Sequence, residues 1–354
     1  MPDSAPLTRI VIVSPALADA NNGNWQTARR WQQMLSPQHA VRIVREWPDA
    51  AASGQDRVML ALHARRSATS IAAWAAAGGT AGLAVVLTGT DLYRDIHSDE
   101  EARHSLALAR RLVVLQERGP DALPAPLRRK ARVIFQSTSA RQALSKSPNF
   151  VRAVMVGHLR EEKSPQTLFA AARLLMDEPS LRIDHIGDAL DPALGEAARA
   201  TAAACPHYRW LGGLTHEATR RRIQRAHVLV HSSRMEGGAH VIMEAIRSGT
   251  PVLASRIDGN LGMLGGDYAG YFAWDDAAAL AALLLRCRKG QTDPPESKHR
   301  ETLLADLSAQ CARREPLFAA HAERAALLQL VAELRQSAQT APAATEPTDS
   351  SSKG

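Results

Sequence analysis

The amino-acid sequence predicts an α/β protein made of two domains, each with a parallel sheet. The chain has 354 residues, too many for one ordinary core and suitable for two domains of about 150 residues each. Short apolar segments alternate with amphipathic helical segments, which is typical of a parallel sheet covered by helices on both faces. This alternation stops at LSKSPN, residues 144–149, and then starts again. We therefore expect a domain boundary near residue 150.

The first half contains six expected strands. Residues 9–14, RIVIVS, are an apolar, β-branched run short enough for a buried strand. After a loop, a helix is expected from Asn24, its predicted N-cap, with Ala28, Trp31 and Leu35 on one face. Five further segments each begin with a strand: 40–46, 56–67, 83–91, 111–116 and 131–137.

The second half repeats the pattern. Residues 150–175 predict strand, loop and helix, with Ser164 as N-cap and Pro165 as the first helical residue. The apolar stripe of this helix is Leu168, Ala171, Ala172 and Leu175. Further strand and helix units are expected within residues 181–189, 207–233 and 238–255.

These patterns divide the chain into four parts. We expect one α/β domain over 1–150 and a second over 151–294. Residues 295–336 are strongly helical and are expected to pack back toward the first domain. Residues 337–354 are rich in Pro, Ser and Thr and are expected to be a disordered tail.

Composition excludes several classes of protein. No apolar run reaches the roughly 20 residues of a membrane span, and the first residues lack a signal-peptide pattern, so a cytoplasmic protein is expected. Cys205, Cys287 and Cys311 stand far apart, which argues against a disulfide framework and a zinc site. The net charge of +7 comes mostly from arginines in short clusters without interleaved aromatic residues. A phosphorylated substrate explains that charge at least as well as a nucleic acid.

Ligands of open parallel sheets bind beyond the carboxyl ends of the strands, so the loops that follow strands are the candidate sites. One of them opens the segment RMEGGAHVIMEAIRSGTPV, residues 234–252. Glu236 can accept hydrogen bonds from sugar hydroxyls, and Glu244, about two turns into the helix, can accept both hydroxyls of a ribose. The amides expected at the helix start, which attract anions, belong to Gly237, Gly238, Ala239 and His240. A charge interaction at the helix end and a solvated helix residue are the alternative explanations of the two glutamates.

A second candidate loop lies in VGHLREEKSP, residues 156–165. The chain turns at Gly157 and places Lys163 just before a helix, where a lysine is a natural partner for phosphate. Arg160 can add a second cation, and His158 can donate a hydrogen bond. A solvated loop with incidental charges is the alternative interpretation.

The two segments resemble the second half of a family-four glycosyltransferase with the GT-B fold, over most of residues 151–290. The resemblance implies two Rossmann-like domains that face each other across a cleft. In that family the lysine and a preceding arginine bind the donor diphosphate, the second glutamate binds the ribose, and the first glutamate with the following amides binds the donor sugar. The matching residues are Lys163, Arg160, Glu244, Glu236, Gly237, Gly238, Ala239 and His240. His158 stands where the family usually has arginine, and Arg160 is expected to compensate.

The first half resembles a narrower group, the selenosugar synthases of selenoneine biosynthesis, in ADANNGNWQTARRW, LHARRSA, LTGTDLYRDI and RVIFQS. This resemblance covers residues 9 to about 335 and implies transfer of N-acetylglucosamine from UDP-GlcNAc to selenophosphate, with loss of UDP and phosphate. Gly23 is expected to touch the donor diphosphate. The acceptor is expected to meet Asn22, Asn24, His63, Arg65, Arg66, Thr90, Asp91 and Arg94. Solvated arginines, a structural histidine and a turn aspartate remain alternative explanations.

Charge suggests the mechanism. Selenophosphate is already an anionic nucleophile, so the demanding step is the departure of UDP, which Lys163, Arg160 and the helix-start amides would stabilise. We expect no metal and no other cofactor, because no Asp-x-Asp motif lies beside these segments. Transfer to another small acceptor, a UDP-GlcNAc 2-epimerase of the same fold, and a non-catalytic nucleotide or nucleic-acid binder remain open. The oligomeric state is not predicted.

Overall fold

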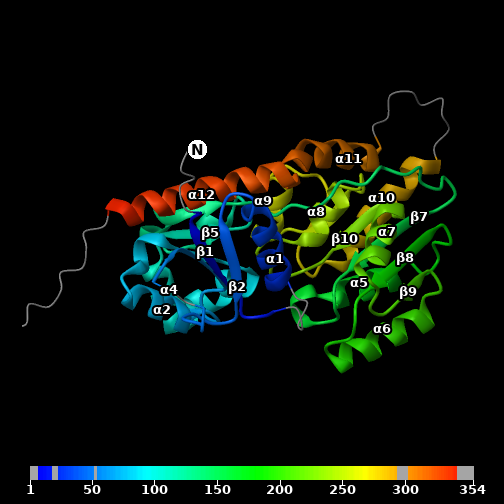
Figure 1. The fold of residues 1–354 in the computed structure, drawn as a ribbon. Helices are drawn as coiled ribbons and strands as arrows, with labels where there is room; N and C mark the ends of the chain where they lie inside the picture. The colour runs from blue at the N-terminus through cyan, green and yellow to red at the C-terminus, as the bar shows by residue number, and fades with distance from the viewer. Residues whose placement is uncertain (1–6, 18–22, 52–53, 293–301, 341–354) are drawn as a thin grey trace, which may run out of the picture.

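The fold consists of two parallel sheets in two lobes. The computed structural model describes residues 7–17, 23–51, 54–292 and 302–340. Within these residues the chain forms two six-stranded sheets in which every paired strand is parallel. Figure 1 shows each sheet in its own lobe with helices around it. The predicted α/β class is therefore confirmed.

The first sheet has the order β2-β1-β3-β4-β5-β6. Its strands are β1 (Arg9–Val13), β2 (Ala40–Val44), β3 (Asp56–Leu62), β4 (Leu83–Val86), β5 (Arg111–Val114) and β6 (Ala131–Val133). All six were expected, although β6 ends at Val133 rather than near residue 137. In β1, Ile10 and Ile12 pack in one core cluster and Val11 and Val13 in another, so both faces of the sheet are buried.

Helices cover both faces of this sheet. They are α1 (Gly23–Leu35), α2 (Ala68–Ala76), α3 (Ile96–Ser98) and α4 (Glu100–Leu108). The predicted face of α1 is confirmed, since Ala28, Trp31 and Leu35 are fully buried. Asn24, however, lies in the first turn of α1 and does not precede it, because the helix begins at Gly23.

The second sheet has the order β12-β11-β10-β7-β8-β9. Its strands are β7 (Val151–Val156), β8 (Leu181–Ile186), β9 (Tyr208–Trp210), β10 (Val228–His231), β11 (Val252–Ser255) and β12 (Tyr271–Phe272). The edge strand β12 was not predicted; its two residues are too short a run to give a pattern. The central position of β10, beside β7, brings the two candidate loops of this domain together.

The helices of the second domain are α5 (Pro165–Leu174), α6 (Pro192–Ala204), α7 (His216–Arg225), α8 (His240–Ile246), α9 (Asp258–Leu264) and α10 (Ala277–Thr292). Pro165 begins α5 as predicted, but Ser164 does not cap it. Ser164 has a left-handed backbone (φ 45°), and its hydroxyl accepts a hydrogen bond from Trp274 Nε1 at 3.0 Å. The helix after Glu236 also starts later than expected. Glu244 therefore lies little more than one turn into α8.

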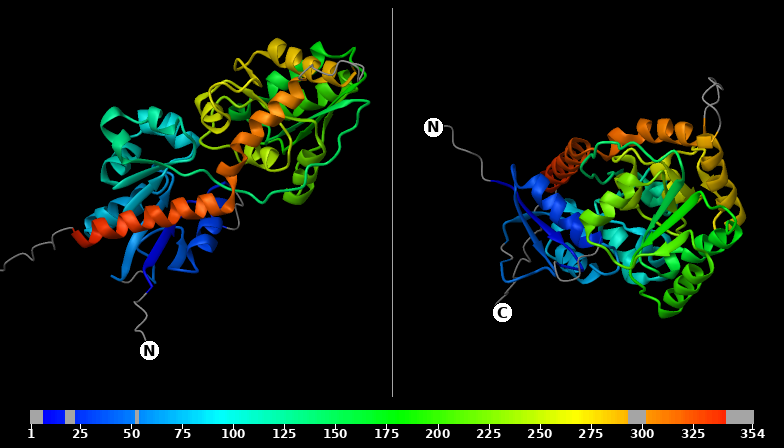
Figure 2. Two further views of the ribbon diagram at one scale, coloured as in Figure 1. Left: turned by 90° about the horizontal axis from the view of Figure 1, so that it is seen from above. Right: turned by 90° about the vertical axis from the view of Figure 1, so that its right-hand side faces the viewer.

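The C-terminal helices return to the first domain. Helix α11 (Leu303–Arg314) packs with the second domain, and α12 (Ala320–Thr340) crosses to the first, as Figure 2 shows from above. The first domain buries an apolar stripe of α12: Leu327, Leu330, Val331 and Leu334. Helix α12 continues through residues 337–340, so the predicted tail cannot begin at 337; residues 341–354 lie outside the described residues.

One buried carboxylate ties α12 to the first domain. Glu323 is 1% exposed. It accepts hydrogen bonds from Arg30 Nε at 2.9 Å, from Trp31 Nε1 at 2.7 Å and from the Ser137 amide at 2.8 Å. Removing either side of such a network leaves buried polar groups without partners, so the network holds α12 in one register.

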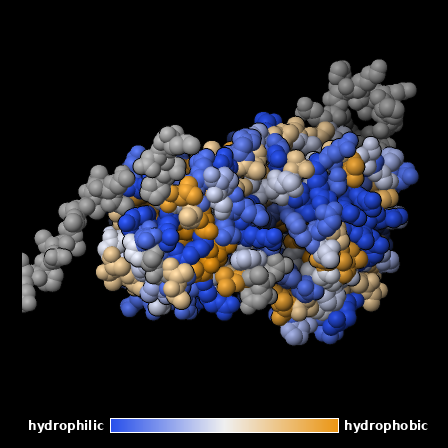
Figure 3. Space-filling view, viewed as in Figure 1, coloured by the Kyte–Doolittle hydropathy of each residue, from blue (hydrophilic) through white to orange (hydrophobic). Residues whose placement is uncertain are grey.

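A hollow separates the two lobes on the face shown in Figure 3, and hydrophilic residues lie along much of its border. The segment that joins β6 to β7 crosses between the lobes and packs on α7. Arg220 is 2% exposed and donates to Thr138 Oγ1 at 2.6 Å and to the Ser139 carbonyl at 2.8 Å. The connection between the domains is therefore anchored on the second domain.

Candidate functional site

The centre of the site is an ion pair at the carboxyl edge of the second sheet. Strands β7 and β10 are neighbours, so the loops that follow them lie side by side. Lys163 Nζ lies 2.5 Å from Glu236 Oε1 and donates a hydrogen bond to it. The Lys163 side chain is 16% exposed and that of Glu236 is 13% exposed, so both charges are largely withdrawn from water. The two residues singled out in separate segments therefore form one unit.

Gly157 and Ser232 explain how Lys163 reaches this position. A methyl group at Gly157 would lie 3.3 Å from the Lys163 stem, so the glycine leaves room for the lysine to cross the loop. Ser232, just after β10, donates from Oγ toward the Lys163 and Ser164 carbonyls, each at 3.0 Å. The lysine loop is thereby attached to the neighbouring strand.

The electrostatics keep Glu236 ionised. Burial alone would raise the pKa of Glu236, but Lys163 and the ring of His231 outweigh burial, and the pKa lies well below its ordinary value. His231 Nε2 is 3.4 Å from Glu236 Oε1, and burial lowers the pKa of His231. Sequence reasoning missed His231. Its place as the last residue of β10 was the available signal, because ligand-facing residues follow the carboxyl ends of strands.

The backbone after Glu236 leads into α8. Ala239 precedes the helix with extended angles, and His240 is its first residue. His240 Nε2 is buried and has no hydrogen-bond partner among the described residues. Burial and then Arg30 lower the pKa of His240 to about 3, so its ring is neutral. The helix start therefore adds amide dipoles but no histidine charge beside the ion pair.

Glu244 is buried and faces α7. Its Oε1 accepts a hydrogen bond from His216 Nε2 at 2.7 Å and lies 4.0 Å from Arg220 Nη1. The hydrogen bond from His216 to Glu244 raises the pKa of His216. Neither partner was predicted, because His216 stands 28 residues earlier in the chain and only the packing of α7 on α8 brings it close. One oxygen of Glu244 is therefore engaged, and any diol that binds there must share it.

The other residues of the lysine loop are more exposed. Arg160 is 47% exposed, and its Nε lies 3.9 Å from Glu162 Oε2. His158 is 53% exposed, and its Nδ1 accepts from the Asp188 amide at 3.1 Å. The structure thus places Arg160 and His158 at the rim near Lys163, where their side chains contact Glu162 and Asp188 and form no hydrogen bond or ion pair with Lys163 or Glu236.

In the first domain, buried residues at the ends of β3 and β4 form a second cluster. His63 is 2% exposed and has a left-handed backbone (φ 74°), an unfavourable conformation for a side-chain-bearing residue. Its Nδ1 accepts from the Arg66 amide at 3.3 Å, which leaves Nε2 to donate to Thr90 Oγ1 at 3.3 Å. Burial lowers the pKa of His63, consistent with a neutral ring.

Asp91 differs from the expectation of direct acceptor contact. It is fully buried, and its carboxylate accepts from the Ala64 amide at 2.9 Å, the Thr88 amide at 2.6 Å and the Thr88 hydroxyl at 2.8 Å. Burial raises the pKa of Asp91, against the opposing effect of His63 and these donors. Asp91 therefore positions the loops after β3 and β4 and does not face a ligand.

The predicted arginines of the first domain remain near the surface. Arg65 Nε and Arg94 Nε each lie 3.1 Å from Asp95, and Arg94 Nη1 lies 3.9 Å from Glu162 of the second domain. Arg66 is exposed. Gly23 and Asn24 lie in the first turn of α1, and Asn22 lies outside the described residues.

The two domains meet at two glycines. A methyl group at Gly237 would lie 2.5 Å from the Gly89 nitrogen, and one at Gly89 would lie 2.9 Å from the Gly237 nitrogen. Only residues without a side chain permit this approach. The loop after β4, which carries Thr90, therefore lies directly against the loop that carries Glu236. Candidate residues predicted from separate halves of the sequence therefore lie on neighbouring loops.

Two features are absent from the described residues. Among the described residues no group of three or more His, Cys, Asp or Glu side chains is arranged to hold a metal ion. In the same part of the chain no helix has the length and apolar character required to cross a bilayer.

Comparison with known proteins agrees with this geometry. Residues 136–301 match the family described as "Glycosyl transferases group 1", so the second domain carries a match to that family's domain. No curated protein matches the chain by sequence.

Solved structures of low sequence identity share the fold. HepE of Anabaena in complex with UDP is 14% identical, with a TM-score of 0.68, over 92% of this chain and 100% of that one. Sucrose-phosphate synthase of Thermosynechococcus elongatus is 17% identical, with a TM-score of 0.68, over 93% and 98%. TarM of S. aureus, in complex with Fondaparinux, alpha-GlcNAc-glycerol and UDP, is 12% identical, with a TM-score of 0.60. That match covers 77% of this chain but 55% of TarM, so the chain spans little more than half of TarM. The fold is GT-B.

Proposed function

We propose that this protein is a glycosyltransferase that uses a UDP-sugar as donor. The observation that carries the proposal is the withdrawn Lys163–Glu236 pair, set at the carboxyl edge of one sheet and covered by the Gly89 loop of the other. The match of residues 136–301 to a glycosyltransferase family, and the UDP present in HepE and TarM, support the choice of donor.

Each part of the site has a role in breaking the bond between the sugar and UDP. Lys163 can move its hydrogen bonds from Glu236 to the diphosphate, where its charge stabilises the negative charge that develops on the leaving group. Glu236, released from Lys163, can accept hydrogen bonds from hydroxyls of the donor sugar. Glu244 binds the ribose hydroxyls in competition with His216, which holds Oε1 of Glu244 in the free protein. Arg160 at the rim and the amides that begin α8 would add to the positive potential of Lys163 around the diphosphate, and the proposal includes no resident metal or other cofactor.

We propose N-acetylglucosamine as the sugar and selenophosphate as the acceptor. The C1–O bond to UDP breaks with its electron pair leaving on UDP, and a selenium lone pair forms the C1–Se bond. Water then cleaves the Se–P bond, which releases phosphate and the selenosugar. The resemblance of the first-half loops motivates this acceptor, and the exposed Arg65, Arg66 and Arg94 beside the cluster of His63 and Thr90 support an anionic one.

The proposal is tested by incubating the protein with UDP-GlcNAc and selenophosphate. Mass spectrometry should show UDP and a selenium-bearing N-acetylhexosamine, and Lys163→Ala should abolish most of both. UDP release with a different small acceptor, and none with selenophosphate, would retain the transferase and reject the acceptor. Conversion of UDP-GlcNAc without any acceptor, followed by NMR, would instead identify a 2-epimerase and reject the transferase.

A further inference from the structure

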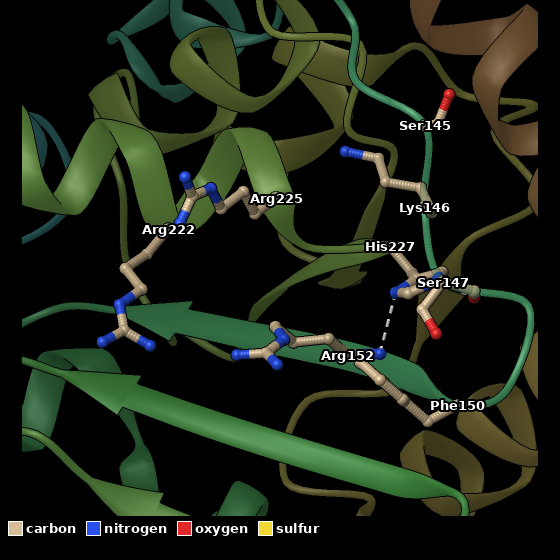
Figure 4. A pocket seen from close by; sticks show the side chains of 8 residues that line it. All are labelled: Ser145, Lys146, Ser147, Phe150, Arg152, Arg222, Arg225 and His227. Carbon is tan, nitrogen blue, oxygen red and sulfur yellow. Dashed lines mark hydrogen bonds between the residues drawn. The ribbon is translucent and has the colours of Figure 1, made fainter.

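A cationic cavity lies on the second domain away from the interdomain site. It has a volume of about 290 Å³ and opens between α7, β7 and the segment that joins the domains, as Figure 4 shows. Its lining includes Lys146, Arg152, Arg222, Arg225 and His227, and no acidic side chain. Arg152 is the second residue of β7, so the cavity lies at the amino edge of the sheet. A strand of this length spans about 20 Å, which separates the cavity from the Lys163–Glu236 pair.

The positive charge of this cavity is only partly neutralised. Arg152 Nη1 and Arg222 Nη1 lie 3.1 Å and 3.4 Å from Asp184 Oδ2, while Arg209 Nη2 lies 2.6 Å from Asp184 Oδ1. Three guanidinium groups therefore share one carboxylate, which is 1% exposed. Since Arg has no accessible neutral form, two positive charges remain there.

Two further cations have no carboxylate partner within the described chain. Lys146 donates to the Gln224 carbonyl at the end of α7, and burial lowers the pKa of Lys146 to about 8. Arg225 is exposed at the same helix end and forms no ion pair with a described residue. Cations are favoured in the last turn of any helix, which accounts for Arg222 and Arg225. The same helix end also attracts Lys146 through the Gln224 carbonyl, but it does not account for Arg152, which comes from β7.

The cavity is also rigid. His227 Nδ1 accepts from the Arg152 amide and His227 Nε2 donates to the Ser147 carbonyl, both at 2.9 Å. The joining segment is thereby attached to β7 before any ligand binds. Phe150 lies under the guanidinium groups of Arg152 and Arg182, at 5.4 Å and 4.2 Å from its ring centre. A preformed group of donors costs little reorganisation when it binds an anion.

We propose that this cavity is a second binding site, for a small anion that carries phosphoryl groups. Such a ligand would accept hydrogen bonds from Lys146 and Arg225. It would also be attracted by the excess positive charge of Arg152, Arg209 and Arg222 around Asp184. Arginine and lysine match phosphoryl oxygens in geometry and charge. The ligand would connect the joining segment to α7 at the amino edge of the sheet, whereas the interdomain site lies at the carboxyl edge.

Calorimetric titration of the whole protein with inorganic pyrophosphate tests this site. Lys163→Ala weakens the interdomain site, so in this variant the remaining pyrophosphate binding depends more strongly on the cavity, and removal of the cavity cations shows how much of it the cavity accounts for. In that background, Lys146→Gln with Arg225→Gln should weaken binding about 100-fold, since each charge-assisted hydrogen bond contributes about tenfold. Arg221→Gln is the matched control, because Arg221 lies on α7 but pairs with Glu217 at 2.9 Å; it should leave the affinity unchanged.

Several results would overturn the proposal. The first is that the Lys163→Ala protein does not bind pyrophosphate. The second is that its affinity for pyrophosphate stays the same after Lys146 and Arg225 are replaced. The third is that Arg221→Gln lowers this affinity as much as the double replacement does. If the double variant does not fold, Arg225→Gln alone, at an exposed helix end, should weaken binding about tenfold. Salt-sensitive binding of a single-stranded oligonucleotide that pyrophosphate fails to displace would reject the small-anion site in favour of a nucleic-acid contact.

Discussion

Replacing Lys163 by alanine tests the central pair most directly. In the free protein the ammonium is held by Glu236 at 2.5 Å, and both side chains are mostly buried. The pKa of Glu236 is lowered in the folded protein. The Glu236 carboxylate therefore contributes its full stabilisation above the ordinary carboxylate pKa, and this stabilisation is lost as the pH falls through the lowered pKa. At neutral pH Glu236 is therefore ionised, and the variant removes its lysine partner.

The expected catalytic loss follows from the role of the lysine. A group that stabilises charge developing on a leaving group, in a site withdrawn from water, contributes about 2–4 kcal/mol to the transition state. Lys163→Ala should therefore lower kcat/KM about 30- to 900-fold. The larger part should appear in kcat, because the diphosphate gains most of its charge as the bond to the sugar breaks.

The same variant has a separate effect on folding. Without Lys163, the Glu236 carboxylate remains buried with only His231 nearby, at 3.4 Å. Breaking a buried pair from one side costs about 3–5 kcal/mol, and the residual contact with His231 favours the lower end. Glu236→Gln in the same chain should recover part of this loss, so the double-mutant cycle should give a coupling energy of about 1–3 kcal/mol.

The assay is UDP release measured at saturating and at low UDP-sugar, together with urea unfolding of each variant. Lys130→Ala is the control, because the Lys130 ammonium donates to the Leu106 and Ala107 carbonyls of the first domain and lies outside the site. An unchanged kcat/KM in a folded Lys163→Ala protein would refute the catalytic role. A coupling energy near zero would refute the buried pair.

Four other predictions follow from the contacts around the site. Glu244→Ala should weaken UDP binding about tenfold or more through the lost hydrogen bonds to the ribose, and equal Kd values for UDP in both proteins would remove Glu244 from the site. The hydrogen bond to Glu244 raises the pKa of His216, so the charged contact is complete below the ordinary value of 6.5 and is lost as the pH rises through the raised value. The affinity for UDP should therefore rise as the pH rises through the raised pKa of His216, because Glu244 is then released to the ribose. His216→Gln should make the affinity for UDP nearly independent of pH in this range. The same pH dependence in His216→Gln and in the wild type would show that His216 does not compete with the ribose for Glu244. Glu323→Ala should lower the free energy of unfolding by about 3–5 kcal/mol, because buried donors lose their acceptor, and an unchanged urea midpoint would exclude this. Gly89→Ala should hold the domains apart and lower kcat while the urea midpoint changes little; wild-type turnover would show that the close contact with Gly237 is not needed.

Much of the fold was predictable because its signals are local. Each central strand is a short apolar run buried on both faces, and each helix has an apolar stripe, so the alternation along the chain was sufficient for the α/β class and the restart near residue 150. The errors lie at element ends and edges. The late start of α8, the non-capping Ser164 and the two-residue β12 depend on contacts with other elements, which no local pattern contains.

The site divides in the same way. That Lys163, Glu236 and Glu244 are functional candidates follows from the sequence, because loops after parallel strands converge at one edge whatever the side chains are. The sequence does not predict which of these residues form pairs with each other or with other residues. Asp91 was a candidate for ligand contact and is instead an internal anchor, since three donors from two loops surround it only in the folded chain.

The sequence alone thus determined the order of the main strands and helices, the two-domain division and the loops that are candidates for a site, because these depend on neighbouring residues. Only the tertiary structure decided the partners: Lys163 with Glu236 across 73 residues, His216 with Glu244, and Glu323 of α12 with α1. The physical reason is that ion-pair and hydrogen-bond energies depend on distances of a few ångströms and on burial. Those quantities are set when distant segments pack, and spacing along the chain does not encode them.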